Sequence, residues 1–305
     1  MDRSQVVISM RLKETLQRVL PQIIVETARS VLRRDGRKAL LVPEAPPEWE
    51  YLPNGWRTHD PRIKGWNVDS ILKTQLAKWP QFLRLVCGTG PLPIHLWAAD
   101  LSAPNYAAQN ALMAYAYVLA LAAWKKDRVS LLDWGGGIGH YNRISQALLP
   151  HVEIEYHCKD VPVLCQAGRE LQPTGTFYAD DAACFARDYD LVLASGSLEY
   201  FEDWKGVVER LASASRSYLY VTRLPIVHQA RSFVVVQRPY QHGYDTEYMG
   251  WFLNRQEFLD HVGSLEMTLR REFLINEGLV ARAAPERCEV RGFLFARKGT
   301  SRNGR

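Results

Sequence analysis

The sequence predicts an α/β protein whose main domain is a doubly wound parallel sheet. From Arg128 onward, apolar runs of strand length alternate with helical segments, which is typical of a parallel sheet covered by helices on both faces. The first apolar run passes directly into a glycine-rich turn. The chain has 305 residues, 47% of them hydrophobic and 23% charged, so it can bury a full core without disulfides or metals.

Seven strands are expected in this domain, with helices between them. The expected strands are 129–134, 154–158, 175–178, 191–194, 218–222, 267–273 and 292–296, and the expected helices between them are 141–149, 163–171, 203–215 and 254–262. Crossovers between parallel strands are right-handed, so a ligand is expected at the carboxyl ends of the strands.

The domain boundary is expected near residue 102. Residues 1–102 are expected to form a helical and irregular extension that wraps the core, and residues 103–305 the ligand-binding domain, with a lid-like insertion at about 224–252. Residues 12–32 place apolar residues at helical spacing opposite a basic face, interrupted by Pro21. That helix either has a solvated basic face or makes a peripheral contact with an anionic membrane.

Composition argues against several classes of function. The five cysteines include no C-x-x-C pair, and no metal-site signature is present, so we expect no metal and no disulfide framework. The longest apolar run, 111–124, is too short to span a bilayer, and no secretory signal is evident. We therefore expect a cytoplasmic protein, with the peripheral contact at the inner membrane face left open. The net charge of +5 is mild and the basic residues are scattered, which argues against a nucleic-acid partner.

The glycine-rich turn is the most informative stretch of the sequence. It carries an acidic residue and four glycines: Asp133, Gly135, Gly136, Gly137 and Gly139. Glycines permit a sharp turn and bring backbone close to a ligand, and the following helix presents free N–H groups at its start. A dinucleotide site favours G-x-G-x-x-G, but the spacing here is G-x-G-x-G. The carboxylate before the glycines suits a cofactor with a cationic amino-acid part.

Further candidate cofactor residues follow the next strands. Asp160, followed by Val161, stands where a carboxylate would accept hydrogen bonds from ribose hydroxyls, although it could also cap the next helix. Asp180 or Asp181 could accept the amino group of adenine, and turn chemistry explains the pair equally well. Ser195 ends the fourth strand and is expected to border the cofactor.

Together these residues resemble class I S-adenosylmethionine-dependent methyltransferases over about residues 128–297. The resemblance implies a Rossmann-like, doubly wound seven-stranded sheet whose last strand, 292–296, is antiparallel. It also implies S-adenosyl-L-methionine as cofactor and S-adenosyl-L-homocysteine as product. By the same resemblance, Asp133 and the glycines hold the methionine part and Asp160 holds the ribose.

A narrower resemblance covers most of the chain beyond about residue 45. The stretches 132–140, 160–162, 194–200 and 250–252, together with 49–51, resemble a bacterial methyltransferase family whose members are often encoded among surface-polysaccharide genes. This resemblance implies a sugar or glycan-precursor acceptor, methylated on a hydroxyl or an amine.

Candidate catalytic and substrate residues lie around the expected cofactor. A hydroxyl acceptor needs a base, and the candidates are His140, Glu199 and His242. His140 could instead donate to backbone or to the cofactor carboxylate, and Glu199 could be a solvated residue. Aromatic faces and polar edges suit sugars, so the expected substrate-binding residues are Tyr200, Arg223, Tyr244 and Tyr248.

The sequence alone leaves several alternatives open. The aromatic segment 237–248 is either a substrate lid or a homodimer contact. The protein is either an enzyme or a non-catalytic methyltransferase-like module of a glycan-assembly complex. An NAD-dependent oxidoreductase is the third reading, against which the glycine spacing and Asp133 argue.

Overall fold

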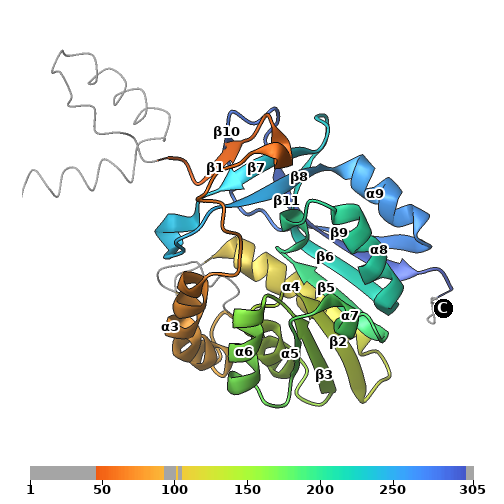
Figure 1. The fold of residues 1–305 in the computed structure, drawn as a ribbon. Helices are drawn as coiled ribbons and strands as arrows, with labels where there is room; N and C mark the ends of the chain where they lie inside the picture. Colours follow the sequence, from red (N-terminus) through yellow and green to blue (C-terminus); the bar gives the residue numbers. More distant parts are fainter. Residues whose placement is uncertain (1–45, 93–100, 102–104, 300–305) are drawn as a thin grey trace, which may run out of the picture. The chain divides into compact units, whose positions relative to one another are not determined.

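The computed structural model describes residues 46–92, 101 and 105–299 (Figure 1). Pro46–Arg305 forms one compact unit, so the expected boundary near residue 102 does not coincide with the boundary of this unit. The expected basic helix at 12–32 lies outside the described residues, and so does its expected membrane contact.

All seven expected strands are present and form the expected sheet. In sheet order they are β4 (Thr176–Tyr178), β3 (Glu153–Lys159), β2 (Arg128–Trp134), β5 (Tyr189–Ser195), β6 (Ser215–Val227), β11 (Glu289–Arg297) and β9 (Met267–Leu274). The first five are parallel to one another, whereas β11 is antiparallel to both of its neighbours. The predicted Rossmann-like fold, with its antiparallel last strand, is therefore confirmed.

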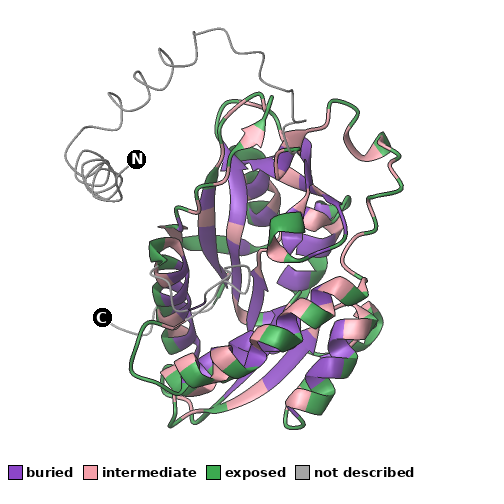
Figure 2. Ribbon diagram, turned by 90° about the vertical axis from the view of Figure 1, so that its left-hand side faces the viewer, coloured by how far each residue is buried: buried purple, intermediate pink, exposed green. Residues whose placement is uncertain are grey.

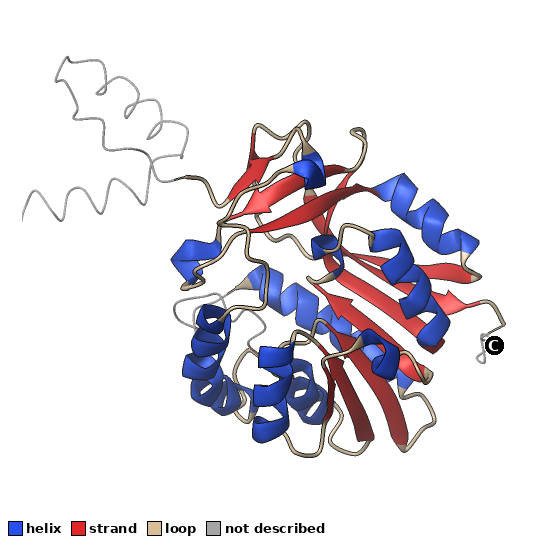
Figure 3. Cartoon of the chain, in the orientation of Figure 1, coloured by secondary structure: helices blue, strands red, loops and turns tan. Residues whose placement is uncertain are grey.

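Four further strands extend this sheet from the end of β6. They are β8 (Tyr248–Asn254), β7 (Phe233–Gln237), β1 (Trp49–Tyr51) and β10 (Ala281–Arg282), paired in that order. β8 joins the sheet through Ile226↔Leu253, and β7 and β8 are antiparallel. Much of the expected lid-like insertion at 224–252 is thus buried sheet, because its Val-rich run packs with Trp49 and Phe252. Figure 3 shows this strand layer beside the parallel sheet.

Helices cover both faces of the sheet. They are α3 (Asp69–Val86), α4 (Tyr106–Ala122), α5 (His140–Leu148), α6 (Pro162–Leu171), α7 (Asp181–Cys184), α8 (Trp204–Ala214) and α9 (Arg255–Ser264), with short 3₁₀ turns at Gly55–Arg57, Leu198–Tyr200 and Pro239–His242. Each of these helices carries buried residues as well as exposed ones, as the colouring by burial in Figure 2 shows.

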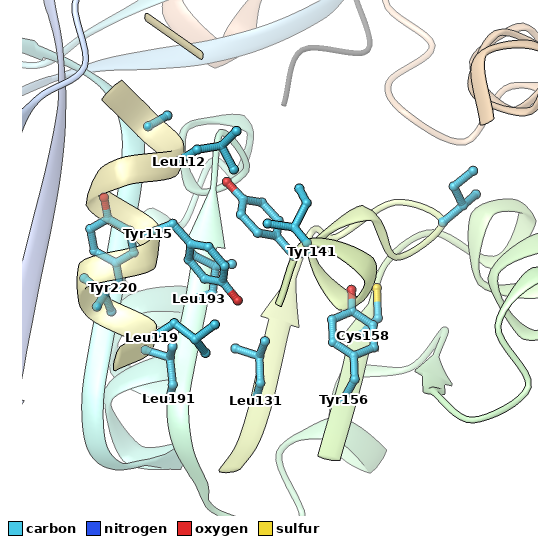
Figure 4. Close-up of a cluster of buried hydrophobic side chains, with 14 of the residues drawn as sticks. Leu112, Tyr115, Leu119, Leu131, Tyr141, Tyr156, Cys158, Leu191, Leu193 and Tyr220 are labelled. Carbon is cyan, nitrogen blue, oxygen red and sulfur yellow. The ribbon is translucent and has the colours of Figure 1, made fainter. Parts of the chain in front are cut away.

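Side chains of the central strands point alternately to the two faces of the sheet, so these strands contribute to the hydrophobic core on both faces. Leu131 and Leu193 point to the face covered by α3, α4, α5 and α6, where they meet Leu119 of α4 (Figure 4). Their neighbours Leu132 and Val192 point to the opposite face, against α8 and α9. A central strand buried on both faces is apolar over most of its length, which explains why these runs were recognisable in the sequence.

Candidate functional site

The glycine loop joins the end of β2 to the start of α5. Gly135, Gly137 and Gly139 all have positive φ, of 77°, 61° and 91°, a region that residues with a side chain adopt only under strain. A Cβ on Gly135 would overlap the side chain of Ser197, and one on Gly139 would overlap Nε2 of Gln172. Ser197 and Gln172 therefore pack directly against the loop. Because the loop carries no side chains at its glycines, a ligand can approach its backbone.

Two adjoining cavities, of about 110 and 100 Å³, border this loop. Described residues that line both are Trp66, Gln75, Gly135, Gly137 and Gly196. The first cavity is also lined by Trp134, Lys159, Asp160, Val161, Leu164, Ser197, Tyr200 and Phe201. The second is also lined by Gly136, His140, Tyr141, Ile144, Ser195, Arg223 and Tyr244. Six of the ten expected cofactor residues therefore lie at the cavities: Gly135, Gly136, Gly137, Asp160, Val161 and Ser195.

Asp133 lies beneath the loop and does not line either cavity. Its carboxylate is buried and accepts a hydrogen bond of 2.6 Å from the hydroxyl of Tyr156. Burial raises the pKa of Asp133 to about 7, and the charge of Asp160 adds to the rise. A Cβ on Gly136 would overlap this carboxylate, so Asp133 supports the loop from the core side.

Asp160 lines the first cavity and ties the loop to β3. Its carboxylate accepts hydrogen bonds from the backbone N–H groups of Gly137, at 2.7 Å, and Val161, at 2.6 Å. Burial raises the pKa of Asp160, and these two bonds act in the opposite direction. Only two of its acceptor positions are used by backbone, so the carboxylate can bind a ligand as well as hold the loop.

The structure places Asp180 and Asp181 away from the cavities. Asp180 caps α7, accepting from the N–H groups of Ala182 and Ala183 at 3.1 Å each. Asp181 pairs with Lys159 at 2.7 Å and with Arg210 at 3.5 Å. Capping of α7 therefore explains the acidic residue at position 180. Asp181 is linked to the site only through its ion pair with Lys159, which lines the first cavity.

His140 is the candidate base that the structure brings to a cavity. Its ring lies edge-on to Trp79 and Phe82 of α3, at centroid distances of 5.1 and 4.8 Å. Burial lowers the pKa of His140 to about 3, so the imidazole is neutral at physiological pH. Its Nε2 has no hydrogen-bond partner among the described residues.

Glu199 and His242 do not join His140 at the cavities. Glu199 is buried, and burial raises its pKa to about 8, with the nearby charge of Arg223 opposing that rise. The imidazole of His242 lies 3.2 Å from the carboxylate of Glu48, outside both cavity linings. The three candidate catalytic residues therefore do not form one group, because His242, at the end of η3 (Pro239–His242), lies against Glu48 and Glu199 lines neither cavity.

Three of the four expected substrate residues line the cavities. These are Tyr200 at the first, and Arg223 and Tyr244 at the second. Arg223, which has an unusual φ of 57°, pairs with Glu277 at 2.6 Å. Tyr248 does not line either cavity but stacks on Trp66, with ring centroids 4.4 Å apart.

Two cavity residues before the glycine loop were missed in the sequence, Trp66 and Gln75. Trp66 precedes α3, and the backbone beside it is held where the N–H of Gly65 donates to the carbonyl of Glu247 at 3.2 Å. Gln75 belongs to the buried stripe of α3, with Ile71 and Trp79 one turn away on either side. A polar residue within an apolar helical stripe is a signal that could have identified it.

Unpartnered polar atoms gather at these cavities. Four of the buried side-chain atoms without a hydrogen-bond partner in the described structure belong to lining residues: Trp66 Nε1, Gln75 Oε1, Trp134 Nε1 and His140 Nε2. A buried donor or acceptor without a partner is costly, so these four atoms favour a site completed by a ligand.

The described residues contain no group of three or more His, Cys, Asp or Glu side chains that could hold a metal ion. Among the described helices, none is both long enough and apolar enough to cross a membrane.

Comparison with known proteins gives a family match and several distant structures. A family model described as "Methyltransferase domain" matches residues 106–263. No curated protein matches the sequence. Similar solved structures include the magnesium protoporphyrin IX methyltransferase of Synechocystis PCC 6803, at 14% identity and a TM-score of 0.43, covering 75% of this chain and 97% of that one. Another is the 1,6-didemethyltoxoflavin-N1-methyltransferase of Burkholderia thailandensis, at 12% identity and a TM-score of 0.42, covering 61% and 78%.

Proposed function

Because the chain belongs to the family described as "Methyltransferase domain", we propose that it methylates a hydroxyl group of a small polar acceptor, such as a sugar or a glycan precursor. The chain is a methyltransferase enzyme, and its cofactor is S-adenosyl-L-methionine. The family match argues against the NAD-dependent oxidoreductase. When bound, the cofactor supplies a methyl group activated by attachment to a sulfonium.

The residues at the cavities fit this cofactor. It carries an ammonium, a carboxylate, a ribose and an adenine, and each needs hydrogen-bond partners once water is excluded. The described site offers the unpartnered Nε1 of Trp134 and Nε2 of His140, together with the Asp160 carboxylate. The glycine loop adds backbone at positions where side chains would clash. Gly135, Gly137 and Asp160 would hold the cofactor, with Asp160 accepting from the ribose hydroxyls.

The second cavity is the proposed site of the acceptor. Its lining combines the ring of Trp66 with the hydroxyls of Tyr141 and Ser195, whose oxygens lie 2.9 Å apart. Tyr244 adds a further phenol. Aromatic faces beside hydroxyl groups suit a neutral acceptor rich in hydroxyls, which supports a sugar.

His140 is the single observation that carries the choice of a hydroxyl acceptor. A hydroxyl must lose its proton as its oxygen is methylated, so a hydrogen-bond acceptor beside it assists the reaction. His140 presents a buried Nε2, without a partner in the described structure, at this cavity. Its pKa of about 3 keeps the ring neutral, so it accepts the hydrogen bond of the hydroxyl and orients it, while the proton released on methylation passes to solvent.

Calorimetry with S-adenosylmethionine and S-adenosylhomocysteine tests the cofactor site. Wild type should bind both, whereas Gly137→Val and Asp160→Ala should abolish or strongly weaken binding. Asp180→Ala is the matched control, because this carboxylate caps α7 away from both cavities. A correctly folded wild type that binds neither compound would refute the proposal.

Transfer of an isotopically labelled methyl group identifies the acceptor. A panel of sugars and nucleotide sugars, compared with small amines, should show labelled product with the hydroxyl compounds. Labelling confined to the amines would overturn the hydroxyl assignment. Cofactor binding without transfer to any compound, even from cell extracts, would favour the non-catalytic module.

A further inference from the structure

Helix α3 lies outside the matched residues 106–263, yet its Gln75 lines both cavities. It packs against α5 and α6, and Figure 1 shows it beside α6. Its buried stripe contains Gln75 and Trp79, one turn apart, and Trp79 contacts the ring of His140 just after the glycine loop. The helix is thus positioned to complete a site that the matched domain leaves open.

Gln75 is the polar member of that stripe, and the structure orients its amide. The side chain is 6% exposed. It hydrogen-bonds the hydroxyl of Tyr244, while Oε1 has no partner among the described residues. The amide nitrogen therefore makes the bond to Tyr244 and the oxygen remains to be satisfied. A Cβ on Gly137 would lie 3.1 Å from this oxygen, which places Oε1 directly over the glycine loop.

We infer that Gln75 is a cofactor-binding residue and that its amide oxygen accepts a hydrogen bond from the ammonium of the methionine part. This inference rests on the proposed function. An ammonium has three donors and needs buried acceptors. Asp133, the acceptor expected from the sequence, lies beneath the loop and already accepts a hydrogen bond from the hydroxyl of Tyr156. Gln75 offers an acceptor on the opposite side of the loop, where both cavities meet.

Two ligands separate this role from a structural one. S-adenosylhomocysteine contains the amino-acid part, whereas 5′-methylthioadenosine retains the adenosine and lacks the ammonium. Calorimetry on Gln75→Met, which keeps the length of the side chain without its oxygen, should show about tenfold weaker binding of S-adenosylhomocysteine, the size expected for a hydrogen bond to a charged group. Binding of 5′-methylthioadenosine should change less than about twofold, since the bond is absent from that complex.

Two further variants complete the test. Gln75→Glu keeps an acceptor oxygen and should bind S-adenosylhomocysteine within about threefold of wild type. Gln166→Met, at an exposed position on α6, is the control and should leave both affinities unchanged. Equal losses for the two ligands in Gln75→Met, or no loss for either, would overturn the inference, as would a loss in Gln75→Glu as large as in Gln75→Met. Absence of binding by wild type would instead refute the proposed function.

Discussion

Replacing Gly139 with alanine tests whether the glycine loop is as tightly packed as its geometry indicates. Gly139 has a φ of 91° and precedes α5 directly. A Cβ there would overlap Nε2 of Gln172 and lie 2.9 Å from Cζ of Phe177. Gln172 cannot yield easily, because its Nε2 donates to the carbonyls of Ile138 at 2.6 Å and Gly139 at 2.9 Å.

The expected loss of stability combines two terms. The left-handed conformation costs an alanine about 1–2 kcal/mol. Overpacking against Gln172 and Phe177 costs about 1–3 kcal/mol more. We therefore expect Gly139→Ala to destabilise the protein by about 2–5 kcal/mol, which lowers the melting temperature by roughly 10 °C in a domain of this size.

Gly65→Ala is the matched control for this experiment. Gly65 also has a positive φ, of 72°, but a Cβ there would meet nothing within 4 Å. For Gly65→Ala only the cost of the left-handed backbone conformation applies, so the melting temperature should fall by about 3–6 °C. Thermal unfolding followed by circular dichroism compares the two variants. Equal shifts would refute the reasoning, since they would show that Gln172 and Phe177 accommodate the methyl group at negligible cost.

Three further predictions follow from single side chains. Burial raises the pKa of Glu199 to about 8 from 4.5, so the folded state holds this proton more tightly and wild-type stability should fall as the pH rises from 4.5 to 8. Glu199→Gln should remove this dependence, gaining on the order of 4 kcal/mol at pH 8 in urea unfolding, and identical pH profiles would contradict the assignment. Asp203 caps α8 by accepting from the N–H of Gly206 at 3.0 Å, so Asp203→Ala should cost about 1 kcal/mol in the same assay while Asp203→Asn retains most of the stability; a loss in Asp203→Asn equal to that in Asp203→Ala would rule out the cap. His140→Phe preserves the aromatic packing and removes Nε2, so kcat for methyl transfer should fall about 100-fold with little change in melting temperature, and an unchanged kcat would exclude His140 from the reaction.

The predictable part of the fold was the part whose signals are local. Central strands such as β2 and β5 are mostly apolar on both faces, so they stand out as nearly continuous apolar runs in the sequence. The extra strands β1 and β10 are only three and two residues long, and each is a strand only because its neighbour pairs with it. Pairing between segments far apart in the chain leaves no periodicity within such short stretches.

The residues of the candidate site also fall into two groups: those that local sequence signals predicted and those whose position depends on tertiary packing. Gly135, Gly137 and Asp160 were expected from spacing, and all three line the cavities. His242 looked equally suitable by residue type, but η3 turns it toward Glu48. Trp66 carried no local signal of function, since its position depends on stacking against Tyr248.

The sequence by itself determined the alternation of strands and helices, the glycine loop and the acidic residues that accompany it. These features follow from side-chain periodicity and from backbone angles that only glycine adopts freely, both of which are properties of neighbouring residues. The tertiary structure alone decided which side chains surround the cavities, that Asp133 lies under the loop, and that burial leaves His140 neutral and Glu199 protonated near pH 7. Those outcomes depend on packing and desolvation by residues distant in the chain, which no local pattern encodes.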